Sequence, residues 1–443
     1  MKKHIKLLIV LGIVLLSGIS FFLGKESKEK DIFKEESSNI KKKDTHLNSV
    51  SMMLETGANS GNYEMTTRDS WPTDGYIFNS ELSKCENGGE LSWDKEKKVV
   101  LMSGNVSDKC YVYFDVIPTI ADICTSGENL STCVKNFGDK GYDISKIYIH
   151  NSSLQNGAND NSYRYAGAHD VVDNFVCFGT DTKPCPDDNL YRIIGVFGDK
   201  VKLIKYDYAT KELLGEDGDY IKLYTERNDN TSNYYENNLV KIAAYAWNYK
   251  KDMSINNGYG SNTWSTSLLN KINLNTNFIN NIGTNWIDKI IETTWKVGGN
   301  IHVNIETQPA KVAYQNEIVN PVMTYSTDNQ TEYNAKIGLM YVSDYMYAAL
   351  QDKWILAGSI YNDASKDYRS ATSVNWLYMG LVEWTISRCA NNENYVFYVN
   401  YGGQVNATNA NNYLAIRPAF YLSNSVSYLS GSGTKTDPII LGD

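Results

Sequence analysis

The segment that decides the fold reads Tyr191-Arg192-Ile193-Ile194-Gly195-Val196-Phe197-Gly198-Asp199-Lys200-Val201-Lys202-Leu203-Ile204-Lys205. Two runs rich in β-branched residues flank Gly198-Asp199, and a two-residue turn that begins with glycine is a strong hairpin signal. We therefore predict two paired strands, at residues 191–197 and 200–205. A second hairpin is expected at Tyr395 to Asn400, with Gly402-Gly403 in its turn.

Helical patterns lie between these two hairpins. Apolar residues recur at helical spacing in residues 264–279 and again in residues 285–295. Ser343-Asp344 is typical of the cap before a helix, which we expect at residues 345–350. Because strands and helices follow no regular alternation, we predict an α+β domain over residues 163–443 rather than a doubly wound sheet.

A smaller unit is expected before this domain. Residues 90–93 and 98–102 flank a charged turn and predict a hairpin, and residues 110–116 read as a further strand. We interpret residues 71–118 as a small all-β sandwich module. Residues 119–162 are interpreted as a connector, with weak helical character around Leu130 to Phe137.

The N-terminal part of the chain predicts a location outside the cytoplasm. Basic residues precede an apolar run over residues 7–24, and a bilayer is crossed by about 17 to 25 apolar residues. We predict a membrane anchor over residues 1–24, contacting the membrane through residues 7–24; a cleaved signal peptide is the alternative. The basic side stays inside, so the protein is expected at the cell membrane as a single-pass protein with an extracellular C-terminal part, or secreted if the segment is cut.

Residues 25–70 carry one charged block after another and few large apolar residues. Such a composition cannot bury enough apolar surface to fold. We therefore predict a disordered stalk over residues 25–70.

The cysteines agree with an oxidising compartment. Six of the seven cysteines form three pairs that are close in sequence: Cys85 with Cys110, Cys124 with Cys133, and Cys177 with Cys185. Short-range pairing outside the membrane indicates disulfides. Zinc is the rival interpretation, but the chain has no C-x-x-C motif and its five histidines are scattered, so no metal site is predicted.

The net charge of −9 disfavours a nucleic-acid partner. Phosphate binding relies on clustered Lys and Arg, and no basic stripe occurs outside the N-terminal segment. The sequence also lacks a glycine-rich phosphate loop, a G-x-S-x-G elbow and an H-E-x-x-H motif. No cofactor and no enzymatic activity are therefore predicted.

A family resemblance rests on an ordered set of segments in the C-terminal domain. These segments are residues 191–196 (YRIIGV), 262–270 (NTWSTSLLN), 336–345 (KIGLMYVSDY), 382–388 (VEWTISR), 416–422 (IRPAFYL) and 431–438 (GSGTKTDP). Their order resembles an uncharacterised family of Gram-positive (Firmicutes) surface proteins, whose C-terminal domain is allied to the formylglycine-generating (sulfatase-modifying) and C-type-lectin-like fold. Residues 71–76 (WPTDGY) resemble the small module that often precedes such domains.

The resemblance implies a compact, irregular α+β body whose long loops display a ligand surface. The resemblance does not extend to the catalytic and ligand-binding motifs of these proteins. Formylglycine-generating enzymes use two nearby cysteines to bind copper, and only Cys389 lies in the corresponding region, so an oxidase is expected only if Cys177 or Cys185 lies close to it. The calcium loops of C-type lectins, of the Glu-Pro-Asn and Trp-Asn-Asp types, do not occur.

The candidate ligand-binding residues are Trp376, Glu383, Trp384 and Arg388. Aromatic faces beside polar groups can hold a sugar ring or a peptide side chain. Core packing is the favoured alternative for these residues. Cys389 is interpreted as an incidental thiol because no histidine follows it. Asp181, Asp187 and Asp188 lack the spacing of a calcium loop and are interpreted as a solvated acidic turn.

Together these observations predict a membrane-anchored surface protein of the extracytoplasmic space. Its distal domain is expected to act in binding or adhesion, with a glycan, a cell-wall polymer or a host protein as ligand. The alternative is a surface enzyme, an oxidase or a hydrolase, on the sulfatase-modifying-like scaffold.

Overall fold

The computed structural model describes residues 49–67, 70–72, 74–104, 108–224, 234–236, 239, 241–249, 258–305, 307–323, 330–355 and 372–443. The chain divides into two compact units, Met1–Ile117 and Pro118–Asp443, which are described separately. Within these described ranges, no helix is both long and apolar enough to cross a membrane. The expected anchor at residues 1–24 lies outside the described residues.

The first unit is built from two layers of strands. Its larger sheet has the order β2-β1-β6-β3, and a separate hairpin pairs β4 with β5. The bounds are β1 Ser49–Glu55, β2 Tyr63–Thr66, β3 Tyr76–Cys85, β4 Glu90–Asp94, β5 Val99–Ser103 and β6 Lys109–Val116. Trp93 of the hairpin packs edge-on against Phe114 of the sheet, with ring centroids 5.7 Å apart, so an aromatic core joins the two layers.

The structure differs from the expected stalk at residues 49–66. β1 pairs in parallel with β6, and β2 pairs with the other edge of β1. Met52 is 9% exposed and belongs to the core of the unit. The composition of this segment gave no sign of folding because its partner strand, β6, lies more than fifty residues later in the chain. Of the predicted stalk, residues 25–48 lie outside the described residues.

The second unit is a mixed α+β body around a central sheet. Among the described residues this sheet follows the order β18-β23-β12-β11-β9-β8, and β10 also pairs with β11. The bounds are β8 Ile147–Ile149, β9 Tyr163–Tyr165, β10 Phe175–Cys177, β11 Leu190–Phe197, β12 Lys200–Lys205, β18 Ile337–Gly338 and β23 Ala419–Tyr421. Seven of the eight residues of β11 are buried, as expected for a strand that is covered on both faces.

Short sheets surround the central one. Their orders are β13-β14-β22, β15-β17, β16-β19-β20-β21 and β25-β24-β7. The bounds are β7 Glu128–Asn129, β13 Tyr220–Leu223, β14 Ala243–Ala246, β15 Thr293–Lys296, β16 Gly299–Asn300, β17 Glu332–Ala335, β19 Glu383–Cys389, β20 Tyr395–Val399, β21 Val405–Asn409, β22 Tyr413–Leu414, β24 Ser427–Ser430 and β25 Ile440–Gly442.

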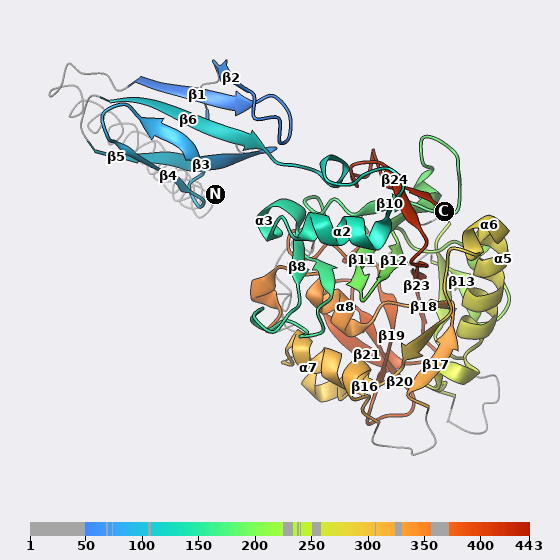
Figure 1. Ribbon diagram of the computed structural model, residues 1–443. Coiled ribbons are helices and arrows are strands. Elements are labelled where there is room, and N and C mark those ends of the chain that lie inside the picture. The colour runs from blue at the N-terminus through green and yellow to red at the C-terminus, as the bar shows by residue number, and fades with distance from the viewer. Residues whose placement is uncertain are drawn as a thin grey trace, which may run out of the picture. The chain divides into compact units, whose positions relative to one another are not determined.

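The helices are short, and most of them lie at the periphery of this unit, whereas β11, β12 and β23 lie in its middle (Figure 1). Their bounds are α2 Leu130–Gly138, α3 Tyr142–Ser145, α4 Lys211–Leu214, α5 Ile279–Ile282, α6 Thr284–Ile287, α7 Ala310–Tyr314 and α8 Val342–Tyr347, with a π-helical segment at Leu269–Phe278. α8 is an exception to this peripheral position, because all of its residues are buried. Asn129 caps α2, because its side chain accepts hydrogen bonds from the amides of Ser131 and Thr132.

The predicted hairpins are confirmed and the helices only partly so. β11–β12, β20–β21 and β4–β5 all form as antiparallel pairs. The expected helix at 285–295 ends at Ile287, and its last residues form β15, because Trp295 is drawn into a pairing with Tyr333 of β17. α8 begins at Val342 instead of residue 345, with Asp344 inside its first turn.

The expected connector also belongs to the second unit. α2, β8 and β9 bring Leu130, Ile147 and Tyr165 into its main hydrophobic core. The helix expected around Leu130 to Phe137 is confirmed as α2. Residues 119–162 are therefore an integral part of the larger unit.

The three predicted disulfides are confirmed. Cys85 is bonded to Cys110, Cys124 to Cys133 and Cys177 to Cys185. Cys389 is free and buried, as its interpretation as an incidental thiol suggests.

Candidate functional site

The four residues singled out from the sequence lie inside the protein. Trp376 and Glu383 are each 1% exposed, and Trp384 and Arg388 are fully buried. Their polar atoms are used internally. The Trp384 indole donates to the carbonyl of Tyr245 at 2.9 Å, and the Arg388 guanidinium donates to the carbonyls of Val297 and Gln330, each at 2.6 Å.

Glu383 has a similar internal role. Its carboxylate accepts from Nε of Arg417 at 2.8 Å, and both side chains are at most 2% exposed. Removing one member of such a pair leaves an uncompensated buried charge, which costs about 3–5 kcal/mol. This geometry agrees with the packing alternative for these residues, and the ligand surface has to be sought elsewhere.

Two adjoining pockets open on the larger unit. The first, here called the acidic pocket, has a volume of about 340 Å³. The second, here called the His169 pocket, has a volume of about 240 Å³. Both are lined by Tyr206 and Lys435, so the two pockets adjoin at these side chains and are together called the paired pockets.

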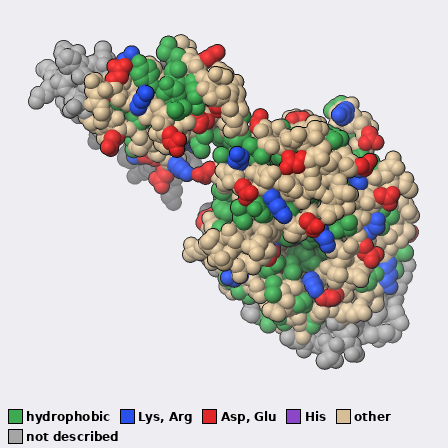
Figure 2. Space-filling view, viewed as in Figure 1, with side chains coloured by type: hydrophobic (Ala, Val, Ile, Leu, Met, Phe, Trp, Pro, Cys, Tyr) green, Lys and Arg blue, Asp and Glu red, His purple; other side chains and the backbone are tan. Residues whose placement is uncertain are grey.

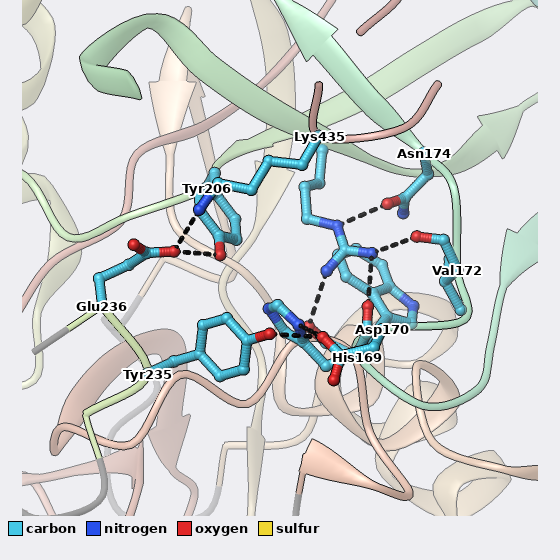
Figure 3. Close-up of polar contacts among 10 residues, drawn as sticks. His169, Asp170, Val172, Asn174, Tyr206, Tyr235, Glu236 and Lys435 are labelled. Atoms are coloured by element: carbon cyan, nitrogen blue, oxygen red, sulfur yellow. Dashed lines mark hydrogen bonds and ion pairs between the residues drawn. The ribbon is translucent and has the colours of Figure 1, made fainter. Parts of the chain in front are cut away.

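A cluster of three side chains marks the boundary between the two pockets (Figure 3). The Tyr206 hydroxyl and the Lys435 ammonium both donate to the same carboxylate oxygen of Glu236, Lys435 at 2.6 Å. The ammonium also lies 4.8 Å from the centroid of the Tyr206 ring. Tyr206 directly follows β12, and Lys435 lies in the loop between β24 and β25, so the cluster joins distant parts of the chain.

His169, Asp170 and Tyr235 form the wall of the His169 pocket. The His169 ring lies against the Tyr235 ring, with centroids 4.0 Å apart. Nδ1 of His169 lies 3.1 Å from Oδ1 of Asp170, and the Tyr235 hydroxyl donates to the same oxygen. Figure 3 shows the Tyr235 hydroxyl directed at this pair.

The electrostatics of the pocket keep His169 neutral. Burial, together with the nearby Arg192 guanidinium, lowers the pKa of His169 to about 3. The hydrogen bond from Tyr235 keeps the pKa of Asp170 below its usual range. Because an ionised carboxylate only accepts hydrogen bonds, Nδ1 of His169 carries the proton and Nε2 is left as an acceptor. Nε2 has no hydrogen-bond partner among the described residues.

Arg192 of β11 supports the wall of the His169 pocket through hydrogen bonds and ring contacts. Its guanidinium donates to Asn174 at 2.5 Å and to the carbonyl of Val172 at 2.6 Å. It lies between the rings of Phe175 and Trp376, at 4.3 and 4.6 Å from their centroids. Trp376, predicted as a ligand contact, therefore contacts Arg192, which in turn supports the His169 pocket.

The acidic pocket takes its name from Asp187, Asp188, Asp207 and Glu236. Asp207 accepts from the Tyr234 hydroxyl at 2.6 Å, and burial raises its pKa. Lys241 lies 3.7 Å from Asp188. Asp187 and Asp188 follow Cys185 after one residue, Pro186, so the Cys177–Cys185 disulfide ties the wall of this pocket to β10.

The paired pockets favour ligands that donate hydrogen bonds. Six carboxylates and two lysines line them, and Tyr206, Tyr235 and His169 supply aromatic surface. Acidic and basic side chains are interspersed on the face of the larger unit that Figure 2 shows.

The one set of potential metal ligands found close together in the described part of the chain is Cys85, Asp108 and Cys110, and its two sulfurs form a disulfide.

Few residues of the paired pockets could be predicted from the sequence. Asp187 and Asp188 are exposed on a short 3-10 turn, which agrees with their interpretation as a solvated acidic turn, but that interpretation does not predict that they line the acidic pocket. His169, Tyr206, Tyr235, Glu236 and Lys435 come from four separate segments and form no motif. The one available signal was Lys435, which lies inside the segment 431–438 that contributes to the family resemblance.

No family model, no curated protein and no solved structure matches this chain. The resemblance to formylglycine-generating and C-type-lectin-like domains therefore stays a prediction.

Proposed function

We propose that this chain is a membrane-anchored protein of the extracytoplasmic surface, and that its larger unit binds a glycan or a sugar-containing wall polymer in the paired pockets. The observation that carries this proposal is the combination of an exposed aromatic ring, that of Tyr235, with several carboxylates around adjoining cavities. A host glycoprotein would present the same chemistry.

Sugar rings need two kinds of contact. Their C–H faces pack on aromatic rings, and their hydroxyls donate to well-placed acceptors. Tyr235, which is 40% exposed, offers the first kind, and the carboxylates of Asp170, Asp188 and Glu236 offer the second. The total volume of the two pockets suits one or two sugar residues better than an extended peptide.

The charge of the pockets narrows the ligand class further. With six carboxylates against two lysines, an anionic polymer would be repelled. Neutral sugars and amino sugars are therefore favoured over sialylated, sulfated or phosphorylated ones.

The location is supported by two independent features. Three disulfides form from cysteines that the sequence pairs, and disulfides persist in oxidising compartments. The N-terminal apolar run over residues 7–24 is long enough to span a bilayer. We further propose that the larger unit is a C-type-lectin-like, sulfatase-modifying-like domain, and that the smaller unit is a β-sandwich spacer.

One observation favours a second candidate, a surface glycan hydrolase. A neutral histidine held by a carboxylate, as His169 is by Asp170, is the arrangement of a general base. Turnover of a bound glycan that His169→Gln abolishes without loss of binding would favour this candidate over a pure binding function.

The proposal is tested by screening the full chain on an array of neutral, amino and acidic glycans. We expect binding to neutral or amino sugars, with affinity reduced about tenfold or more in Tyr235→Ala. Tyr259→Ala is the matched control, because Tyr259 is 48% exposed and lines neither pocket. A folded chain that binds no glycan, or equal losses in both variants, would refute the proposal.

A further inference from the structure

The larger unit contains a lysine and an aspartate in direct contact deep inside the protein. Nζ of Lys202 lies 2.5 Å from Oδ2 of Asp344, and the two side chains are 0% and 1% exposed. Lys202 lies on β12 and Asp344 on α8, 142 residues apart in the chain. Neither residue lines the paired pockets.

Aromatic rings enclose this pair. The ammonium of Lys202 lies 4.4 Å from the ring centroid of Tyr341, and 5.2, 5.3 and 5.9 Å from those of Trp295, Tyr421 and Phe197. Tyr421 faces Lys202 across the pairing of β12 with β23. The rings exclude water from both faces of the contact, so neither charge is solvated.

A second carboxyl group lies close to the pair. Glu317 is fully buried, and its carboxylate accepts from the backbone amide of Ser343, next to Asp344, at 3.0 Å. Burial raises the pKa of Glu317 to about 7, and burial lowers the pKa of Lys202. Glu317 can therefore hold or release a proton near neutral pH, and burial favours the uncharged form of the Lys202 amine.

We propose that Lys202 and Asp344 join in an intramolecular isopeptide bond, with Glu317 transferring the proton that the reaction moves. The contact places Nζ of Lys202 against Oδ2 of Asp344, one bond from Cγ, and such preorganisation corresponds to effective concentrations on the order of 10⁵ M or more. The backbone amide of Tyr341 donates to the reacting Oδ2 at 2.8 Å and stabilises charge that develops there.

The step is balanced without an oxidant or any co-reactant. A proton passes from the Lys202 ammonium to the Asp344 carboxylate, which gives an amine and a carboxylic acid. The Nζ lone pair attacks Cγ of Asp344 and the C–N bond forms. Glu317 accepts a proton from nitrogen and returns one to the hydroxyl, the C–O bond breaks, and one water molecule leaves.

The energetics favour the amide over the ion pair. Two charges removed from water lose their hydration, and their mutual attraction does not always offset that loss. An amide carries no net charge and keeps the two elements in contact. The neighbouring pair of Arg164 and Asp160, at 2.6 Å, cannot react in this way because a guanidinium stays protonated.

Mass spectrometry of the intact full chain tests the proposal. We expect a mass lower, by one water molecule, than that of the chain with three disulfides. Tryptic digestion should give a branched peptide that joins Lys202 to Asp344, since trypsin cannot cleave after an acylated lysine. A folded, oxidised chain of full mass would overturn the proposal.

Variants locate the bond and assign the proton transfer. Lys202→Arg keeps the charge but lacks the nucleophilic amine. Glu317→Gln keeps the shape of the side chain but cannot transfer the proton, so both variants should show the full mass. Lys200→Met, on the same strand, is the matched control and should keep the mass deficit of one water molecule. A deficit that persists in Lys202→Arg would refute the bond, and one that persists at its full rate in Glu317→Gln would refute the role of Glu317.

Discussion

At His169, burial and hydrogen bonding act on a single imidazole. The ring is 4% exposed, Nδ1 is engaged by Asp170, and Nε2 has no partner among the described residues. An unpaired buried acceptor costs about 1–3 kcal/mol. Because Nε2 is closed off from solvent, His169 contributes to the proposed site as a buried part of the pocket wall beside Asp170.

This environment makes stability depend on pH. The folded-state pKa of His169 is about 3, whereas an unfolded histidine titrates near 6.5, so between these values the unfolded chain binds one proton more. The free energy of unfolding therefore falls as pH drops from 6.5 towards 3, by up to about 1.4 kcal/mol per pH unit. In His169→Gln the free energy of unfolding should fall less steeply as pH drops, because the variant lacks the group that takes up one extra proton on unfolding. Urea unfolding at pH 7, 6 and 5 measures this difference. Parallel profiles for the two proteins would contradict the assignment.

At the scale of elements, the Cys177–Cys185 disulfide links the fold to the site. It closes a loop of 8 residues that begins at the end of β10 and leads into Asp187 and Asp188 of the acidic pocket. Reduction should therefore release one wall of the pocket while leaving the central sheet in place.

The double variant Cys177→Ser/Cys185→Ser should lose about 2 kcal/mol of stability and should also lose glycan affinity. Thermal unfolding and binding measured on the same preparation check both expectations. The matched control is Cys124→Ser/Cys133→Ser, which removes a loop of similar size, 9 residues, outside the pockets. Equal effects of the two variants on affinity would show that the loop does not position the site.

β1 is the element that sequence composition failed to predict. Met52 and Met65 lie on the adjacent strands β1 and β2, but Met52 is 9% exposed and Met65 is 68% exposed. Met52→Asp should destabilise the first unit by about 2–5 kcal/mol, because it buries a charge in the core. Met65→Asp should change stability by less than about 0.5 kcal/mol. Equal, small effects in denaturant unfolding would show that residues 49–55 are not part of the folded sheet.

Local patterns predicted the elements whose partners are adjacent in the chain. The turns at Gly198-Asp199 and Gly402-Gly403 and the short-range cysteine pairs were all identified. Non-local pairings were missed: β1 with β6, and β15 with β17. The buried positions of Trp376 and Trp384 could not be predicted either. A sequence does not distinguish an aromatic residue that packs in a core from one that faces a ligand.

At the scale of the whole molecule, the account requires that the chain mature outside the cytoplasm. Protein taken from its native cells with thiols trapped at lysis should contain one free thiol, that of Cys389, which is buried and should react only after denaturation. Mass spectrometry of the alkylated chain counts the thiols. Seven free thiols in folded native protein would place it in a reducing compartment and contradict the proposed location.

The paired pockets are proposed to hold a sugar. A crystal structure of the full chain, soaked with the neutral oligosaccharide that binds most tightly on the array, tests it most directly. The expected result is a sugar ring packed on Tyr235, with a hydroxyl that donates a hydrogen bond to the Asp170 carboxylate. An oligosaccharide bound elsewhere on the molecule, with the paired pockets empty at saturating concentration, would contradict it.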